Sequence, residues 1–396
     1  MSTLNYMEKL LDGVEVEWKA LGDVVSLQRG KRLVKSQLEE TGNYAVYQNC
    51  MTPLGYYHES NVKSDTAFII SAGAAGEIGY SDVDFWAADD VYFFLTSGDI
   101  FSKFLYHFLL TKQNEISSQV RRASIPRLSK AVVEKLKIPI PCPENPKKSL
   151  AIQAEIVRIL DAFTELTAEL TAELTARKKQ YNHYRDQLLS FEEEEVEWKT
   201  LGEIGEVRMC KRILKSQTSS EGEIPFYKIG TFGRDPDAYI PRSLFEEYRA
   251  KYSYPKIGEV LISASGTIGR TVVFDGEDSY FQDSNIVWIE NDESVVLNKF
   301  LFYFYKIANW GISEGGTIQR LYNDNLRKLL IPIPFPNDSK KSLTEQARIV
   351  TILDKFDALT NSIREGLPRE IELRQKQYEY YRDLLLSFPK LEEVAA

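Results

Sequence analysis

Few residue groups in this 396-residue chain have the types and spacing that catalysis needs. Residues 17–19 and 197–199 both read Glu-Trp-Lys, which matches the E-x-K half of a metal-dependent nuclease signature, but no upstream aspartate is shared by the two segments. The two tryptophans are expected to be buried anchors. The three histidines do not recur at matching positions, and three cysteines are too few for a disulfide framework or a CxxC metal site. We therefore expect no catalytic centre and no metal site, with a self-sufficient nuclease as the remote alternative.

Two glycine-rich segments are the next candidates for chemistry, as phosphate-binding loops: SAGAAGEIGY at 71–80 and SASGTIGR at 263–270. Neither has G-x-G-x-x-G spacing after a strand with an acidic residue downstream, which is the pattern of dinucleotide binding. The chain also lacks a P-loop and the N/D-P-P-Y/F motif of adenine methyltransferases. We expect each segment to form a tight turn that brings backbone near DNA, or simply a hairpin.

Basic residues gather in short segments that could bind nucleic acid. Cationic groups neutralise phosphates, and arginine can also donate two hydrogen bonds to guanine O6 and N7. The clusters at 29–35 and 208–215 occur in both halves of the chain, which favours backbone contact over base reading, whereas Arg and Gln at 121–127 and 319–320 suit base edges. An ordinary solvated charge run is the other interpretation. The candidate DNA-binding residues are Arg29, Lys31, Arg32, Lys35, Arg121, Arg122, Arg127, Arg208, Lys211, Arg212, Lys215, Gln319 and Arg320.

The net charge of −9 argues at first against a nucleic-acid partner. Acidic residues, however, concentrate in stretches with helical patterns, such as EEEEVEW at 192–198, while the basic segments lie elsewhere. DNA contacts only one face of a protein, so the sum of charges does not decide the question. A chain this acidic is expected to bind DNA weakly alone and to depend on a basic partner protein.

The chain is a tandem duplication with a period of about 190 residues, which corresponds to a whole domain plus a connector rather than a solenoid repeat. EVEWKALGDV at 15–24 recurs as EVEWKTLGEI at 195–204, and KRLVKSQ at 31–37 recurs as KRILKSQ at 211–217. The endings recur as well, as IPIP followed by KKSL at 138–150 and 331–343, and as YRDQLLSF and YRDLLLSF at 184–191 and 381–388.

The two copies differ most in their middles. About half of the positions from 125 to 163 are identical to those from 318 to 356, whereas YQNCMTPLGYYHESNV and YKIGTFGRDPDAYIPR share little beyond their first tyrosine. A duplicated enzyme would be expected to keep its chemistry in both copies. A shared framework with different middles is what a reader of two different half-sites needs. A scaffold of two ligand-binding domains without a DNA role is the competing interpretation.

Each copy is predicted to be a mixed α/β domain. Apolar and alternating runs bounded by Gly and Asp predict strands at 66–72, 90–96, 259–265, 271–275 and 285–290, and a further strand is expected after the turn that opens each copy. Helical spacing with one apolar face predicts helices at 100–110 and 297–307. The closely spaced prolines of IPIPCP and IPIPFP are expected to end each domain, because they cannot continue a helix or a central strand.

A helix of about 40 residues is predicted after each domain, with Ser149 and Ser342 at the N-caps and Glu345 completing a capping box in the second copy. Such helices are too long and too polar outside one stripe to be stable alone. We expect them to pack on each other as an antiparallel coiled coil, the alternative being that each packs on its own domain. The expected packing residues are Phe163, Leu166, Leu170, Leu174, Tyr181, Phe356, Leu359, Tyr378 and Tyr381.

The fold class is therefore predicted as α+β, with two tandem-duplicated mixed α/β recognition domains joined by two long helices. The expected segments are 1–148 and 192–341 for the domains and 149–191 and 342–396 for the helices. YMEKLLDGVEVEW at 6–18 echoes YRDQLLSFEEEEVEW at 184–198, so the chain is pseudo-twofold and quasi-circular. Tyr6, Leu10 and Leu11 are accordingly expected near Tyr381 and Leu385.

These features resemble the specificity (S) subunit of type I restriction-modification systems. The resemblance rests on the paired variable modules, the IPIP-KKSL-Q-IV-ILD-F block, the TAELTAEL run at 167–174 and the KQY-YRD-LLSF endings, and it covers essentially the whole chain. It is greatest to the IC class. The resemblance implies that each module is a target recognition domain for one half of a split DNA site. No motif in the modules says which bases they read.

The resemblance also implies partners. Double-stranded DNA, two modification subunits and two restriction subunits are expected, and no membrane. Within such a complex the partners use S-adenosylmethionine, ATP and magnesium, while this chain binds no cofactor and is not itself an enzyme. No stretch approaches the run of about 18 apolar residues of a membrane span, and the N-terminus lacks the pattern of a secretory signal. We therefore expect a cytoplasmic protein.

The TAEL run suggests how the spacing between half-sites is set. Four residues nearly match one helical turn, so Leu166, Leu170 and Leu174 fall on one slowly rotating stripe. One unit is worth about 6 Å of helix, or one to two base pairs at about 3.4 Å each. The stretch from Phe163 to Tyr181 is one unit shorter than the stretch from Phe356 to Tyr378. In the family that the chain resembles, the repeat number is associated with the length of the non-specific spacer, although helix filler is the plainer reading.

Overall fold

A computed structural model describes residues 14–192, 196–311, 320–362 and 364–388. The chain divides into two compact units. Unit 1 comprises residues 1–171 together with 370–396, and unit 2 comprises residues 172–369. Unit 1 is therefore assembled from both ends of the chain. The expected contacts of Tyr6, Leu10 and Leu11 lie outside the described residues.

Unit 1 is built on a four-stranded antiparallel sheet in the order β2 (Val25–Arg29), β8 (Val91–Thr96), β5 (Thr66–Ile70) and β6 (Ile78–Ser81). A three-stranded sheet of β4 (Gly55–Tyr57), β3 (Tyr44–Tyr47) and β7 (Trp86–Ala87) lies beside it. Helix α3 (Ser102–Thr111) packs on β5 and β6. β5 is buried along its whole length, which explains why TAFII reads as an unbroken apolar run rather than an alternating one.

Unit 2 repeats this topology strand for strand. Its four-stranded sheet has the order β11 (Gly205–Arg208), β17 (Ile286–Asn291), β14 (Val260–Ser263) and β15 (Thr271–Val273). Its three-stranded sheet contains β13 (Tyr239–Ile240), β12 (Ile224–Tyr227) and β16 (Tyr280–Phe281), and α9 (Asn298–Tyr305) replaces α3. The mixed α/β architecture expected for each copy is confirmed. The shorter helices are α2 (Leu21–Val24), α4 (Gln113–Ser118), α5 (Lys130–Glu134), α7 (Leu201–Ile204), α8 (Arg242–Lys251) and α10 (Asn323–Arg327).

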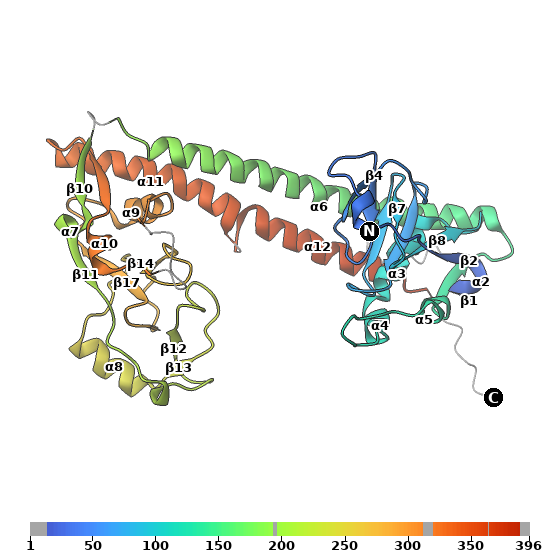
Figure 1. Cartoon of the computed structure of the whole chain (residues 1–396), viewed down its shortest axis with the longest axis horizontal. Helices are drawn as coiled ribbons and strands as arrows, with labels where there is room; N and C mark the ends of the chain where they lie inside the picture. The colour runs from blue at the N-terminus through green and yellow to red at the C-terminus, as the bar shows by residue number, and fades with distance from the viewer. Residues whose placement is uncertain (1–13, 193–195, 312–319, 363, 389–396) are drawn as a thin grey trace. The chain divides into compact units, whose positions relative to one another are not determined.

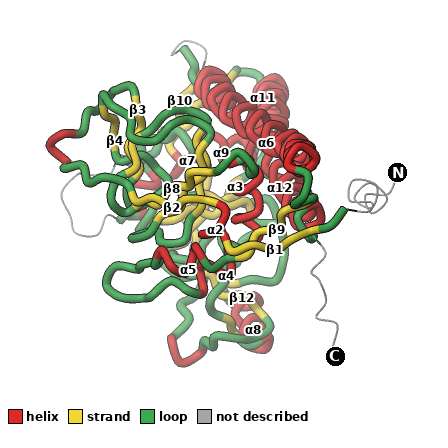
Figure 2. Tube along the Cα trace, turned by 90° about the vertical axis from the view of Figure 1, so that its right-hand side faces the viewer, coloured by secondary structure: helices red, strands yellow, loops and turns green. Residues whose placement is uncertain are grey.

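The IPIP segments form strands, which was not predicted from the sequence, although these are not central strands. β9 (Lys137–Pro141) pairs antiparallel with β1 (Val16–Ala20), and Figure 2 shows the two side by side. β18 (Leu330–Pro334) pairs with β10 (Val196–Thr200) in the same register. These are separate two-stranded sheets, so every strand in them is an edge, where proline costs no ladder bond on its outer side.

The tryptophans of these strands are less enclosed than expected. Trp18 packs against the core of unit 1, where its ring centroid lies 6.3 Å from that of Phe108. Trp198 is 40% exposed, so the prediction of a buried anchor is wrong there. Within each E-x-K segment the lysine pairs with the glutamate, at 2.9 Å for Lys19–Glu17 and 3.4 Å for Lys199–Glu197.

Helix α6 runs unbroken from Pro146 to Leu188 and α11 from Ser339 to Asn361. Both begin before the predicted serine caps. Asn145 Oδ1 accepts from the Lys148 amide at 3.1 Å, and Asp338 Oδ1 accepts from Lys341 at 3.0 Å. The predicted N-caps at Ser149 and Ser342 are therefore wrong.

These serines lie inside the helices and are buried, and each accepts a hydrogen bond at 3.1 Å from the glutamine four residues later, Gln153 or Gln346. Glu345 completes no capping box, because its carboxylate pairs with Arg348 at 2.6 Å. The true caps, Asn145 and Asp338, lie four residues earlier in both copies, outside the KKSL motif on which the prediction rested.

The second long helix is interrupted. α11 ends at Asn361, and α12 (Gly366–Leu385) begins after a four-residue break. Gly366 has φ +75°, and a Cβ there would lie 2.4 Å from the Ala358 carbonyl oxygen. Only glycine adopts that conformation without strain, so Gly366 holds the break. The prediction of one continuous C-terminal helix is wrong at this point.

Segments of the two long helices meet within each unit and run antiparallel there. In unit 1, Leu385, Leu386 and Phe388 of the chain's end join the core that contains Ile152 and Ile156 from the start of α6. Farther along, Phe163 stacks on Tyr381 with ring centroids 5.1 Å apart. In unit 2, the ring centroid of Phe356 of α11 lies 6.3 Å from that of Tyr181 and 5.5 Å from that of Tyr184. Helix α11 also packs on α9 (Figure 1).

The TAEL leucines lie within continuous helix. Leu166 is 36% exposed, and Leu170 and Leu174 are half-buried. Leu359 is half-buried on α11. The ring contacts between the long helices join Phe163 to Tyr381, and Phe356 to Tyr181 and Tyr184, on either side of the TAEL run in sequence.

Candidate nucleic-acid interface

Three loops of unit 2 meet at one end of its four-stranded sheet. The Ala264 amide donates to the Asn285 carbonyl at 2.7 Å, and the Leu321 amide donates to the Ala264 carbonyl at 2.8 Å. These bonds draw together the end of β14, the turn before β17 and the segment that leads into α10. Unit 1 has the same arrangement, since the Ser71 amide donates to the Asp90 carbonyl at 2.7 Å and the Leu128 amide donates to the Ser71 carbonyl at 2.8 Å.

The basic loop after the first long strand is ordered in the same way in both units. Lys35–Gln37 and Lys215–Gln217 each form a 3₁₀ turn. Gln37 Oε1 accepts from the Val34 amide at 3.1 Å, and Gln217 Oε1 accepts from the Leu214 amide at 2.8 Å. The duplicated KSQ letters therefore encode a local turn that presents the preceding cations.

In unit 2 this loop and the converging loops line a cleft of about 420 Å³. Three of the predicted DNA-binding residues, Arg212, Lys215 and Arg320, meet there, although they come from distant parts of the sequence. Lys228 adds a fourth cation, and polar groups of Gln282, Ser284 and Asn285 form much of the remaining wall. A cationic cleft with hydrogen-bonding side chains suits phosphate contact and base-edge contact together.

Each arginine of the cleft makes one contact within the protein and keeps further N–H donors for a ligand. Arg320 Nη2 donates to the Ser284 carbonyl at 3.2 Å, and Arg212 Nε lies 2.9 Å from Asp283 Oδ2. Both arginines are exposed. Each guanidinium has five N–H donors, so one internal contact orients it and leaves most donors for a ligand.

Unit 1 presents its candidate residues on the surface. Arg29, Lys31, Arg32, Lys35, Arg121, Arg122 and Arg127 are all exposed. The loop is fixed by Trp86, whose indole N–H donates to the Lys31 carbonyl at 3.0 Å, and by Arg29, whose Nε donates to the Asp89 carbonyl at 2.6 Å. Arg121 and Arg127 exchange backbone hydrogen bonds at 2.9 and 3.1 Å. The arginines of that segment thus stand on a closed turn beside the sheet end.

Arg208 does not belong with the other candidates. Its guanidinium pairs with Glu206 and Glu290, each at 2.8 Å. The hydrogen bond to Glu290 raises the pKa of Arg208, and the same bond lowers the pKa of Glu290. Lys211 lies over the Tyr252 ring at 5.2 Å, and Gln319 lies outside the described residues. Arg208 is therefore committed to a pair of carboxylates on its own sheet.

Lys228, Gln282 and Asn285 were not anticipated. They lie in the divergent middle of the second copy, where no comparison between copies points to them. The available signal was the tyrosine shared by the middles, because Lys228 directly follows Tyr227. In the described part of the chain, no group of three or more His, Cys, Asp or Glu residues is placed to hold a metal ion.

Two copies of one scaffold, each with a basic face at the same end of its sheet, define a protein with two nucleic-acid-reading modules. The chain belongs to the family of type I restriction modification DNA specificity proteins, whose domain model matches residues 13–177 and again 193–373. It is thus a DNA specificity subunit with two target recognition domains, the non-catalytic component of its system.

The chain is similar over nearly its full length to curated relatives. It is 53% identical to a Haemophilus influenzae protein assigned as a type I restriction enzyme specificity subunit, covering 97% of this chain and 98% of the relative. It is 41% identical to the EcoR124I/EcoR124II specificity subunit of Escherichia coli, covering 100% of both. The likeness to the EcoR124I subunit is consistent with the IC class.

Solved structures share the fold. The S subunit of a type I restriction-modification system from M. genitalium superposes with a TM-score of 0.60 at 17% identity, covering 96% of this chain and 98% of that one. A chain from a study of type I system assembly and conformational transition gives a TM-score of 0.58 at 15% identity, covering 94% and 97%. The expected α+β fold, with two mixed modules and long helices in contact, is confirmed.

Proposed function

We propose that each recognition domain binds one half of a split DNA target through the basic face at its sheet end. The cleft that unites Arg212, Lys215 and Arg320 carries this proposal. In unit 1 the matching role falls to Arg29, Lys31, Arg32, Lys35 and the arginines of 121–127. Arg208 is left out, because its carboxylate partners already neutralise it.

The paired long helices set the distance between the half-sites. The domains would comprise residues 1–148 and 192–341, and the spacer helices 149–191 and 342–396. Helices α6 and α11 begin at Pro146 and Ser339, each three residues before the proposed boundary. The packing residues of this spacer would be Phe163, Tyr181, Phe356, Tyr378 and Tyr381, assisted by Leu166, Leu170, Leu174 and Leu359.

Two modification subunits would dock on the long helices. The same polar triad recurs on α6 and α12: Arg177 bonds Glu173 at 2.8 Å and Gln180 at 2.9 Å, and Arg374 bonds Glu370 and Gln377 at the same distances. A surface that is presented twice suits two copies of one partner. Beside the first triad, a groove of about 680 Å³ lies between α6 and α11 in unit 2.

Two restriction subunits would complete the complex, in the cytoplasm. The partner subunits would catalyse the reactions with S-adenosylmethionine, ATP and magnesium, while this chain recognises the DNA target sequence. No helix in the described segments has the length and apolar character to cross a membrane.

Module exchange tests the proposed function. Residues 25–137 are replaced by the matching segment of another family member, and methylated adenines are mapped in DNA exposed to the complex with its modification subunits. Only one half-site should change, because the rest of the chain keeps the second basic face and both helices. The matched exchange of residues 205–330 should change only the other half. A change in both half-sites after either exchange would contradict the proposal.

A further inference from the structure

A polar cluster recurs where the recognition domain of each unit meets the long helices. In unit 1, Lys103 Nζ of α3 lies 2.8 Å from Asp161 Oδ2 of α6, and His107 Nε2 lies 3.2 Å from Asp161 Oδ1. In unit 2, Lys299 Nζ of α9 lies 2.9 Å from Asp354 Oδ1 of α11, and the Tyr303 hydroxyl donates to the same oxygen at 2.5 Å. The lysine and the aspartate occupy matching places in the two copies.

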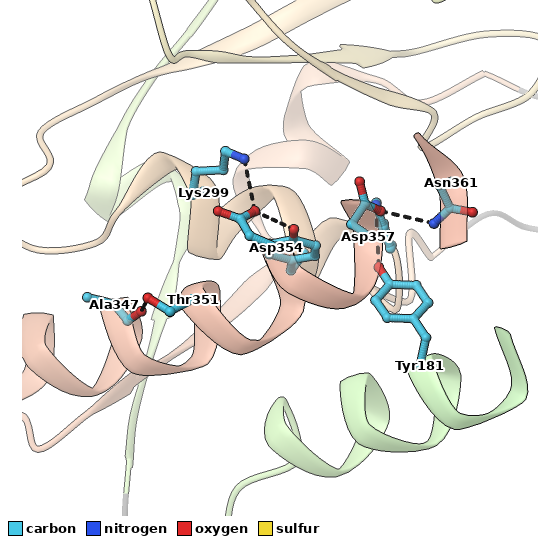
Figure 3. Close-up of polar contacts among 9 residues, drawn as sticks. Tyr181, Lys299, Ala347, Thr351, Asp354, Asp357 and Asn361 are labelled. Carbon is cyan, nitrogen blue, oxygen red and sulfur yellow. Dashed lines mark hydrogen bonds and ion pairs between the residues drawn. The ribbon is translucent and has the colours of Figure 1, made fainter. Parts of the chain in front are cut away.

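The cluster extends to the second long helix in both units. In unit 1, His107 Nδ1 lies 2.8 Å from the Tyr378 hydroxyl of α12. The Asp161 carboxylate can only accept, so the ring proton of His107 is assigned to Nε2. His107 Nδ1 then accepts a hydrogen bond from the Tyr378 hydroxyl. In unit 2, Lys306 Nζ of the turn after α9 lies 3.5 Å from the Tyr181 hydroxyl of α6 and 3.3 Å from Asp357. Figure 3 labels Tyr181 and Asp357 together with Lys299 and Asp354 of the same unit. Tyr181 and Tyr378 are the same residue of the duplicated KQY motif.

The clusters are enclosed only in part: Tyr181 is 5% exposed, whereas the side chains of Lys299 and Asp354 are 48% and 41% exposed. The His107 side chain is 1% exposed and the Asp161 side chain 19%. Burial lowers the pKa of Lys306, although Asp357 opposes the shift, and burial raises the pKa of Tyr181 to about 12. A polar group in such a place costs free energy unless its partners are correctly placed. An all-apolar junction would avoid that cost but would allow the helix to rotate and slide.

Each unit already has an anchor for its nearer helix. Gln153 accepts from the Phe101 amide at 3.0 Å and donates to the Asp99 carbonyl at 2.9 Å, and Gln346 makes the matching bonds to Leu297 and Val295 at 2.9 and 3.1 Å. Both glutamines are fully buried. The nearer helix is therefore fixed independently of the polar cluster, whose tyrosine reaches the other helix.

We propose that Tyr378 in unit 1 and Tyr181 in unit 2 are positioning residues that set the angle at which each recognition domain is held on the helix pair, and thereby determine which spacer length the subunit accepts. This inference rests on the proposed spacing role of the helices. Two positions differ between the junctions: His107 of unit 1 corresponds to Tyr303 of unit 2, and Leu110 corresponds to Lys306. Each junction is therefore matched to its own domain.

The test deletes single hydroxyl groups from the full chain in complex with its modification subunits. Methylation rates are measured on duplexes that carry both half-sites, as mapped for the parent chain, with the parent spacer or with a spacer one base pair longer or shorter. Tyr378→Phe and Tyr181→Phe should each reduce the preference for the parent spacer by about five-fold, the size expected for one buried hydrogen bond. The half-site sequences should not change.

Tyr254→Phe is the matched control, because it also removes a half-buried hydroxyl with a 2.8 Å hydrogen bond, here to the Ser279 carbonyl, away from the long helices. Its spacer preference should equal that of the parent. Asp161→Asn is a second junction variant, and thermal unfolding of every variant verifies the folded state.

The outcomes separate the two proposals. If the parent prefers one spacer and both tyrosine variants keep that preference, or lose methylation equally on all duplexes, the positioning role is overturned while the spacing role stands. If the parent methylates all three spacers equally, the spacing role of the helices fails, and the positioning role fails with it.

Discussion

Two arginines of unit 2, Arg320 and Arg208, differ in what already holds their guanidinium groups. Arg320 gives one hydrogen bond to a carbonyl and faces the basic cleft, whereas Arg208 lies between two carboxylates. A cation that is paired twice within the protein has little attraction left for a phosphate. Two arginines that the sequence offered equally as DNA-binding candidates therefore have different chemistry.

Substitution of these arginines tests the cleft. Arg320→Ala should weaken specific DNA binding by about ten-fold or more, within the range of about 1–3 kcal/mol for a lost base or phosphate contact. Arg208→Ala should change binding less than about two-fold, because it removes an exposed ion pair of small value. Fluorescence anisotropy of the complex with modification subunits, at two salt concentrations, measures both. An equal loss in the two variants would contradict the assignment of the cleft.

The sequence predicted which basic side chains are DNA-binding candidates better than it predicted which residues those side chains contact. The basic segments were visible as runs of letters, and Arg212, Lys215 and Arg320 do meet in one cleft. The runs could not separate Arg208 from its neighbours, because Glu290 is distant in sequence and reaches Arg208 only through the pairing of β11 with β17. His107 was dismissed for failing to recur, yet the structure places it where Tyr303 stands in the other copy.

The two long helical stretches differ in continuity. α6 is continuous through the TAEL run, whereas the equivalent stretch after Phe356 is broken between α11 and α12. That stretch is one four-residue unit longer in sequence, and the break spans residues 362–365. The two helical arms between their aromatic ends thus contain similar amounts of helix.

Insertion of one TAEL unit after Leu174 tests the spacing role. Four residues add about 6 Å to α6, so the preferred spacer should lengthen by one to two base pairs while both half-sites stay the same. Methylation-site mapping measures the spacer. Insertion of four residues in the break at 362–365 is the comparison, since it adds no helix, and it should alter the spacer less. An altered half-site sequence after the TAEL insertion would contradict the role.

Periodicity predicted the existence of these helices but not their ends. The apolar stripe continues across residues 362–365, so spacing alone gave one helix. The Gly-Leu-Pro sequence at 366–368 carried the missing signal, because glycine permits the left-handed conformation and proline suits the first turn of a new helix. The caps failed for a related reason: Ser149 and Ser342 have the right chemistry for a cap, but Asn145 and Asp338 come first.

For the whole molecule, the composition of unit 1 matters most, since it draws its core from residues on both sides of unit 2. Leu385, Leu386 and Phe388 are almost fully buried in that core. Burial of three such side chains contributes several kcal/mol at about 1.5–3 kcal/mol each, against a typical domain stability of about 5–15 kcal/mol. Unit 1 therefore depends on a segment that follows all of unit 2.

Truncation tests this dependence. A chain that ends at Arg369 should lose hydrogen-exchange protection throughout the recognition domain of unit 1, whereas unit 2, which contains residues 172–369, should keep its protection. A chain that ends at Phe388 is the control and should retain protection in both. Mass spectrometry of exchanged peptides measures each unit separately. Equal loss in both units would show that the dependence is not confined to unit 1.

The tandem repeat made the broad architecture readable from the sequence, since each copy supplied a check on the other. What it could not supply was the division into units, because the echo between residues 6–18 and 184–198 indicates only that a helix end is shared. The division follows from packing of side chains such as Phe388, which lies 6.3 Å from Phe104.

The order in which the parts of unit 1 are made has a consequence for synthesis. The ribosome releases the strands of the first recognition domain early, yet the segment that closes their core is translated only after the second domain is already out. The second domain is contiguous in sequence, so its core needs no residue from beyond its own segment. The first module therefore cannot complete its core until those late residues are made, and until then the apolar side chains of α3 and of the start of α6 lack part of their packing partners.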